Sequence, residues 1–533
     1  MQSRRKSTLR KLALAGAAAA ALVLTACAGG GGGDPTNGSG EVGEPVEGGD
    51  LVLALNVDTR SLDPAICPQG GGWSQCQPIF GTLMRYNIIT TEFEPGLAES
   101  LESEDGVHWT LKLRPGLQFS DGTAFDADAV VFNWERILDP ATQSPSLATA
   151  STVKEWTVVD DVTIEFELIS PNFQLPWQFV YGGMGMIGSP TAIEAAGDDV
   201  SNNPVGAGPF TLKEWTRGTQ LVYEKNDLYF EEGKPYVDTY TIKTIGQDDQ
   251  RLNALRSGEI DIDWSLLVND AETMAAEGYN VLSEPMIGGT GVMFNLEDPV
   301  VSDPLLREAM LSAFDSAQIN AALYPGSVPV DQYLFPESPY RDDSRGMFPP
   351  KDLDHAQEVF DEYLDKTGQT EVTVTYTAYA GIPQLEAVAE MIQAQMNQIE
   401  GLNFEINGVD GAALSTAQAT GDFQLLMGAT LGYQMDSMYD YFHSSSTRNY
   451  SKYSNPIVDE ALTLARTSND PDEVADAFKT AAGQVSKDAP VRMWRYQIGF
   501  LIFGDNVHVP EEAMFIHTGG SSMWVQDVWM TEQ

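Results

Sequence analysis

One stretch, His108–Pro140, constrains the fold more than any other part of this 533-residue chain. It opens with the apolar-polar alternation of a strand over residues 108–114 and then turns at Pro115-Gly116 and again at Asp121-Gly122. A helix follows, because Asp126 is a preferred N-cap residue and Pro140 cannot continue a helix. These residues predict a strand, two turns and a capped helix, and by themselves they indicate no activity.

The last third of the chain alternates helical and strand patterns. Apolar residues recur at helical spacing over 354–365, 384–399 and 455–467, and strand-like runs lie at 371–376, 402–406 and 423–431. This alternation is typical of an α/β lobe. A chain of this length, with 42% hydrophobic residues, can also bury enough surface for more than one domain.

Three motifs resemble one family. The letters LKLRPGLQFSDGTAFDADAVVFNWER within His108–Pro140 closely resemble the signature of the extracellular solute-binding proteins of the peptide, nickel and oligosaccharide uptake class, which feed ATP-driven importers. VGAGPF at 205–210 and LRSGEIDI at 255–262 extend the resemblance. It implies a periplasmic-binding-protein-like α/β fold of type II (cluster C), with two lobes, a hinge and a smaller domain inserted in the first lobe.

The resemblance also implies domain ranges. Lobe I would comprise residues 50–66, 208–287 and 519–533, the inserted domain II residues 67–207, and lobe III residues 288–518. The lobes would be joined by crossovers near Met286–Gly288 and Thr518–Ser521, and closure would be a hinge motion.

The N-terminus predicts export and anchoring. Residues 1–26 carry a basic start and an apolar run, and Leu24-Thr25-Ala26-Cys27 matches the lipobox of bacterial lipoproteins. We therefore expect a signal peptide at 1–26, a lipidated Cys27 and a flexible Gly-rich tether over 27–49. The protein would be held on the extracytoplasmic face of the cell membrane or in the periplasm.

The two remaining cysteines, Cys67 and Cys76, lie nine residues apart in a loop rich in Gly and Pro. An even pair in an exported protein predicts one small disulfide loop, and two free buried thiols are the alternative. Two isolated cysteines do not make a zinc site.

The formal net charge of −47 argues against nucleic-acid binding, which needs a basic surface. The acidic surface would serve as a solubilising coat or attract cationic solutes. No HExxH, GxSxG or P-loop motif is present, and the five histidines lack metal-ligand spacing. Gly183–Gly188 spells GxGxxG, but no helix opens within it and the nearest downstream acids lie too close. We therefore expect no enzyme activity, no cofactor and no bound metal.

The resemblance implies a ligand held between the lobes by aromatic rings and by one loop. The candidate ligand-binding residues are Asp58, Trp73, Trp264, Thr430, Tyr433, Gln434, Asp436, Trp494 and Trp524. For each aromatic residue, a role in the core is an equal alternative, because a buried ring is mainly apolar area.

The stretch 429–436 departs from the peptide-binding relatives, in which it resembles GWCADYNEP and its Asp pairs with the α-ammonium of the ligand. Here Tyr433 falls at the position of that Asp and Thr430 at the Trp. Asp436 or Asp440 could take over the ammonium only with a shifted loop. A sugar or a modified peptide is therefore a competing ligand.

These features predict a monomeric substrate-binding lipoprotein of an ABC importer, which captures an oligopeptide or a similar small solute and delivers it to a membrane permease. The alternatives are an oligosaccharide receptor of the same family, a surface sensor or adhesin, and a lipoprotein hydrolase.

Overall fold

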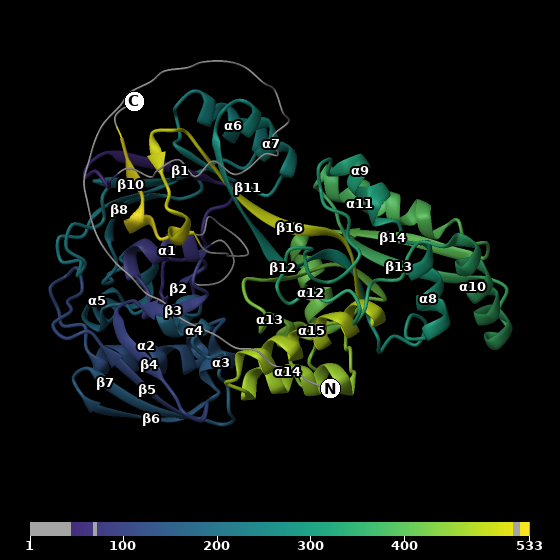
Figure 1. Cartoon of the computed structure of the whole chain (residues 1–533), viewed down its shortest axis with the longest axis horizontal. Coiled ribbons are helices and arrows are strands. Elements are labelled where there is room, and N and C mark those ends of the chain that lie inside the picture. Colours follow the sequence, from purple (N-terminus) through teal and green to yellow (C-terminus); the bar gives the residue numbers. More distant parts are fainter. Residues whose placement is uncertain (1–43, 68–71, 515–522, 532–533) are drawn as a thin grey trace, which may run out of the picture. The chain divides into compact units, whose positions relative to one another are not determined.

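The computed structural model describes residues 44–67, 72–514 and 523–531. The predicted α/β fold is confirmed, and its largest element is a ten-stranded mixed sheet (Figure 1). The strands of this sheet, in spatial order, are β14 (Leu402–Val409), β13 (Val372–Tyr379), β15 (Leu425–Gly432), β12 (Asn280–Phe294), β16 (Val491–Phe503), β11 (Ile262–Ser265), β1 (Asp50–Leu55), β10 (Thr239–Thr244), β9 (Gln220–Lys225) and β8 (Phe210–Thr216).

Two parallel groups of strands are joined by two antiparallel strands. β1 runs parallel to β10 and β11, and β13 runs parallel to β14 and β15. Between these groups, β12 and β16 pair with each other over most of their length, and their register shifts between Pro285 and Gly289 (Figure 1). The two long strands therefore connect the two halves of the sheet.

Two large groups of buried side chains lie on either side of this connection. The first core cluster contains Leu53, Met286 and Leu501, and the second core cluster contains Val292 and Tyr496. Each long strand thus contributes to both clusters. The predicted crossover at Thr518–Ser521 lies outside the described residues.

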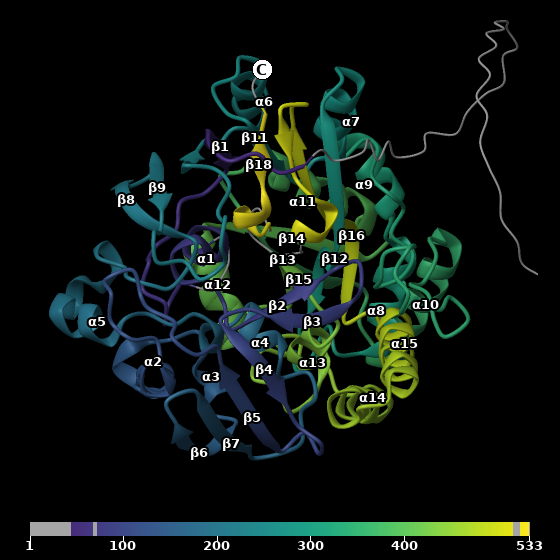
Figure 2. The same ribbon diagram turned by 60° about the vertical axis from the view of Figure 1, so that its left-hand side comes forward.

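A separate four-stranded antiparallel sheet contains the strand predicted at the start of His108–Pro140 (Figure 2). Its order is β4 (Ala98–Glu102), β5 (His108–Leu113), β7 (Thr163–Leu168) and β6 (Val153–Asp160). β5 alternates exposed and buried residues as predicted. Helix α2 (Ala127–Leu138) begins after Asp126, whose side chain accepts a hydrogen bond from Ala129 N at 2.9 Å. The ring of Trp134 then packs on Phe166 of β7, with centroids 5.7 Å apart.

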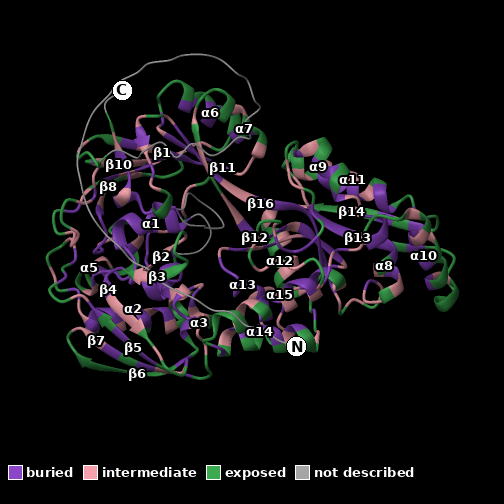
Figure 3. Cartoon of the chain, in the orientation of Figure 1, coloured by how far each residue is buried: buried purple, intermediate pink, exposed green. Residues whose placement is uncertain are grey.

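The remaining elements surround these sheets, and Figure 3 shows that the inner strands are largely buried whereas many helices carry an exposed face. Two short two-stranded sheets pair β2 (Met84–Asn87) with β3 (Glu92–Pro95) and β17 (Val507–His508) with β18 (Trp529–Met530). The other α-helices are α1 (Trp73–Phe80), α3 (Leu147–Ala150), α4 (Trp177–Val180), α5 (Pro190–Ala196), α6 (Asp248–Arg256), α7 (Val268–Ala276), α8 (Pro304–Ala313), α9 (Ser316–Leu323), α10 (Leu353–Thr367), α11 (Pro383–Met396), α12 (Gly411–Thr420), α13 (Ser437–Phe442), α14 (Pro456–Thr467) and α15 (Pro471–Asp488).

Within the described ranges, no helix is long and apolar enough to span a bilayer.

Candidate functional site

One aromatic group contains residues from both sides of the connection formed by β12 and β16. Tyr433 follows β15, a strand whose Leu425 belongs to the second core cluster, but its ring packs on Tyr181, a member of the first cluster. The two ring centroids are 4.0 Å apart. A solute bound at this contact would touch both halves of the protein.

Further rings extend this contact on both sides. Trp73 lies 5.5 Å from Trp524 and 6.2 Å from Tyr181, measured between ring centroids. Trp177 lies 5.6 Å from Tyr181 and 4.3 Å from Tyr86. We call this group the aromatic junction; its members are Trp73, Tyr86, Trp177, Tyr181, Tyr433 and Trp524.

Burial divides the aromatic junction into two parts. Trp73 and Trp524 are 0% and 1% exposed, and the indole N–H of Trp73 donates to Val180 O at 3.0 Å, so both rings are part of the core. Tyr86 and Tyr433 are only half-buried. Burial raises the pKa of Tyr433, and burial together with Tyr340 and Glu284 raises the pKa of Tyr86 to about 12. Both are therefore neutral phenols at physiological pH, able to donate a hydrogen bond.

A glycine lets β12 approach β15 next to the predicted loop. Gly288 has a φ of +80°, and a Cβ built on it would lie 1.9 Å from Thr430 O. The same carbonyl accepts a hydrogen bond from Tyr333 Oη at 3.3 Å. Thr430 itself is fully buried, and its hydroxyl has no hydrogen-bond partner among the described residues. Thr430, a predicted ligand contact, thus lies where β12 approaches β15 so closely that a side chain at position 288 would clash.

The loop after β15 is held by its own contacts. Gln434 Oε1 accepts a hydrogen bond from Asp436 N at 2.7 Å. Both carboxylate oxygens of Asp436 accept from Arg466, at 2.6 Å from Nε and 2.8 Å from Nη2. Asp436 is 6% exposed and fully paired, so its predicted role as partner of a ligand ammonium does not agree with this geometry.

Arg466 lies in α14, at the point where this helix contacts the segment around Phe173. Phe173 N donates to Arg466 O at 2.7 Å, and Gln174 Nε2 donates to Ala465 O at 3.2 Å. These bonds join residues nearly 300 positions apart, as the separation of 291 for the second bond shows. Together with the contact between Tyr181 and Tyr433, they hold the two halves against each other.

The other predicted ligand contacts have different surroundings. Asp58 accepts hydrogen bonds from Trp215 Nε1 and Gly218 N, so it fixes the turn between β8 and β9 to the first loop. Trp494 is 1% exposed and belongs to the second core cluster. Trp264, a candidate ligand contact, lies inside β11 and is 4% exposed.

The structure joins Cys67 and Cys76 in a disulfide, with Cα atoms 6.4 Å apart. Cys76 lies in α1, the helix that begins at Trp73. The disulfide therefore links the loop before α1 to the helix that carries Trp73 of the aromatic junction. Cys27, the predicted lipidation site, lies outside the described residues.

Sequence reasoning missed several residues of this region. Tyr181 and Trp177 have the i, i+4 spacing of a helical pair, which was a usable signal. Tyr86 and Glu284 gave none, because each lies in a strand with no distinguishing motif.

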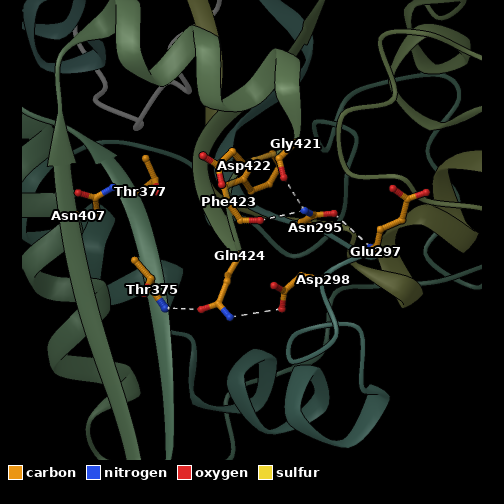
Figure 4. A pocket seen from close by; sticks show the side chains of 10 residues that line it. All are labelled: Asn295, Glu297, Asp298, Thr375, Thr377, Asn407, Gly421, Asp422, Phe423 and Gln424. Atoms are coloured by element: carbon orange, nitrogen blue, oxygen red, sulfur yellow. Dashed lines mark hydrogen bonds between the residues drawn. The ribbon is translucent and has the colours of Figure 1, made fainter.

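A polar pocket of about 550 Å³ lies elsewhere, on the second half of the protein (Figure 4). Gln424 accepts from Thr375 N at 2.8 Å and donates to Asp298 at 3.4 Å, and Asn295 donates to Gly421 O at 3.0 Å. Its lining comes only from segments of the second half, so a ligand there would not bridge the two halves. In the portion of the chain that the structure describes, no group of His, Cys, Asp and Glu residues is arranged to hold a metal ion.

Comparison with known proteins identifies a family. Residues 92–452 match the family of bacterial extracellular solute-binding proteins, family 5 (middle region). The chain is 27% identical over 455 residues to the probable D,D-dipeptide-binding periplasmic protein DdpA of Escherichia coli K12, covering 82% of this chain and 87% of that protein. It is 25% identical over 462 residues to the glutathione-binding protein GsiB of Shigella flexneri, covering 83% and 88%.

A solved structure shows the same fold. The periplasmic binding protein DppA from Helicobacter pylori, in complex with the peptide STSA, superposes with a TM-score of 0.76 at 23% identity, covering 91% of this chain and 99% of that one.

Proposed function

Because this chain belongs to family 5 of the bacterial extracellular solute-binding proteins, whose members are transport receptors and not enzymes, we propose that it captures a short peptide and delivers it to the permease of an ABC importer. The names of its relatives support a peptide: a D,D-dipeptide for DdpA, glutathione for GsiB and the tetrapeptide STSA for DppA.

One observation carries the proposal. The aromatic junction draws Tyr181 from one half of the protein and Tyr433 from the other. Two long strands, β12 and β16, cross between the two core clusters. A ligand at the junction would bind the closed arrangement better than an open one. Such differential affinity is what can shift a hinge equilibrium toward the form that a permease recognises.

The proposal assigns roles to particular side chains. The half-buried phenols of Tyr86 and Tyr433 would stack on and hydrogen-bond to the peptide, while the buried rings of Trp73 and Trp524 keep Tyr181 in place. Of the residues predicted from sequence, Tyr433 and Trp264 remain proposed ligand contacts. Asp58, Asp436 and Trp494 are assigned structural roles.

We also propose that the protein is anchored by lipid on Cys27 and works as a monomer outside the cytoplasm. The lipobox Leu24–Cys27 and the Gly-rich tether support the anchor and the extracytoplasmic location. Radioactive palmitate should label the wild-type protein in cells and not Cys27→Ser. Labelling of both would contradict the anchor.

The ligand class is testable on the full-length protein. Mass spectrometry of small molecules released by denaturing the natively purified protein should find peptides of a few residues. Recovery of oligosaccharides alone would favour the oligosaccharide receptor over the peptide receptor. Conversion of an added peptide to products would contradict a receptor of either kind.

A further inference from the structure

The crossing strand β12 carries an acid, Glu284, on the face that packs toward the first core cluster. Glu284 lies directly opposite Gly499 of β16, and two residues away Leu282 lies opposite Leu501. Residues opposite each other in an antiparallel pair project to the same face. Leu282 and Leu501 both pack in the first cluster, so Glu284 projects to that side as well.

Gly499 presents no side chain opposite Glu284. A Cβ at Gly499 would lie 3.5 Å from Trp264 Nε1 and 3.9 Å from Met286 Cε. Trp264 of β11 lies opposite Leu501, so its indole and the side chain of Glu284 share one face of the sheet. This face belongs to the stretch where β12 and β16 cross from one half of the protein to the other.

Glu284 has no countercharge. It is half-buried, and among the described residues neither an ion pair nor a hydrogen bond joins its side chain to another group. Burial, with a smaller contribution from the nearby Glu511, raises its pKa to about 7. A carboxylate without a partner in such a place is costly unless a cation arrives with the ligand.

Two phenols of the aromatic junction lie within electrostatic reach of this carboxylate. The charge of Glu284 acts on both Tyr86 and Tyr181 and raises the pKa of each phenol, in addition to the larger effect of burial. Trp177 lies between them, with its ring centroid 4.3 Å from that of Tyr86. Aromatic rings near a carboxylate are a combination that attracts an organic cation.

Three other charged residues of this region are held in ion pairs. Arg85, next to Tyr86 in β2, is held by Asp527 and Glu231. Asp436 is held by Arg466, and Asp440 by Arg448 at 2.9 Å. Unlike Asp436 and Asp440, Glu284 therefore has no basic partner in the described part of the chain and is free to pair with a ligand.

We propose that Glu284 is the countercharge for an organic cation of the solute, the α-ammonium group or a basic side chain of a peptide, held between this carboxylate and the rings of Tyr86 and Tyr181. This inference rests on the proposed peptide receptor and deepens it. It replaces the loop acid Asp436, which the sequence suggested, by an acid on the crossing strand itself. A cationic group of the ligand bound there would attach the ligand to the strand that joins the two halves of the protein.

The test uses the full-length protein and three synthetic tripeptide pools built from Ala, Ser and Phe. The first pool has free N-termini, the second is N-acetylated, and the third is N-acetylated with one Lys. Native mass spectrometry measures retention of each pool by the wild type, by Glu284→Gln and by Glu232→Gln. The last variant is a matched control, since Glu232 is exposed and takes part in no ion pair among the described residues.

We expect the wild type and Glu232→Gln to retain the first or the third pool in about tenfold excess over the second, and Glu284→Gln to lose that excess. Retention of the first pool alone assigns the α-ammonium, and retention of the third assigns a basic side chain. Equal retention of the second pool by the wild type, or an undiminished excess in Glu284→Gln, would overturn the inference and leave the peptide receptor standing. Retention of no pool would overturn the peptide receptor itself. Gln has the shape of Glu without its charge, so an unlowered melting temperature will show that the variant is folded.

Discussion

Replacement of Gly288 by alanine should destabilise the protein through one identifiable contact. Gly288 lies in β12 at φ +80°, and a Cβ there would lie 1.9 Å from Thr430 O and 2.7 Å from Tyr333 Oη. The left-handed conformation costs a non-glycine residue about 1–2 kcal/mol. Relief of the clash must separate β12 from β15, which costs about 1–3 kcal/mol more. We therefore expect Gly288→Ala to lower the free energy of unfolding by about 2–5 kcal/mol.

The matched control is Gly258→Ala. Gly258 has a φ of +71°, but a Cβ there would meet nothing within 4 Å. It should show only the conformational cost of about 1–2 kcal/mol. Urea unfolding followed by tryptophan fluorescence compares the two variants. If Gly288→Ala were no less stable than Gly258→Ala, the close approach of β12 and β15 would not exist as described.

Three further predictions concern pairing, cross-linking and pH. Arg466→Met leaves the buried carboxylate of Asp436 unpaired and should lower the free energy of unfolding in urea by about 3 kcal/mol. The side chain of Arg448 is 49% exposed, so Arg448→Met should lower it by less than about 1 kcal/mol. Equal losses would contradict a buried pair. Replacing both cysteines of the disulfide by serine opens a loop with a sequence separation of nine and should cost about 3 kcal/mol, and a melting temperature unchanged by reductant would argue against the bond. The pKa of Glu284 is raised to about 7 in the folded protein, so its contribution to stability is full below the ordinary pKa of a glutamate and is lost as the pH rises through 7. The melting temperature of the ligand-free wild type should therefore fall more between pH 5.5 and 8 than that of Glu284→Gln, and parallel curves would contradict the shift.

Local features could be predicted from the sequence because neighbouring residues determine them. The alternation of β5 and the Asp126 cap of α2 depend on residues within a few positions, and both are confirmed. Helix α11 was predicted over 384–399 and is found at Pro383–Met396, a difference confined to its ends.

The candidate site could be predicted only in part, because distant segments build it. Trp73, Tyr433 and Trp524 were proposed together from the resemblance, and the structure does bring them into one group. The ion pair between Asp436 and Arg466 could not be inferred, since many other acidic residues of the chain could equally have paired with Arg466. Glu284 was missed because an acid in an alternating strand ordinarily faces solvent, and only the register against Gly499 shows otherwise.

The measurement that tests the central claim most directly is amide hydrogen exchange in the segment around Phe173. Its N–H donates to Arg466 O at 2.7 Å, a bond that exists only while the two halves are held together. Exchange of peptic fragments covering 172–175 is followed by mass spectrometry, with and without saturating peptide that co-purifies with the protein. A solute captured between the halves must slow exchange at Phe173, whereas exchange unchanged by saturating ligand would show that binding does not hold the halves together.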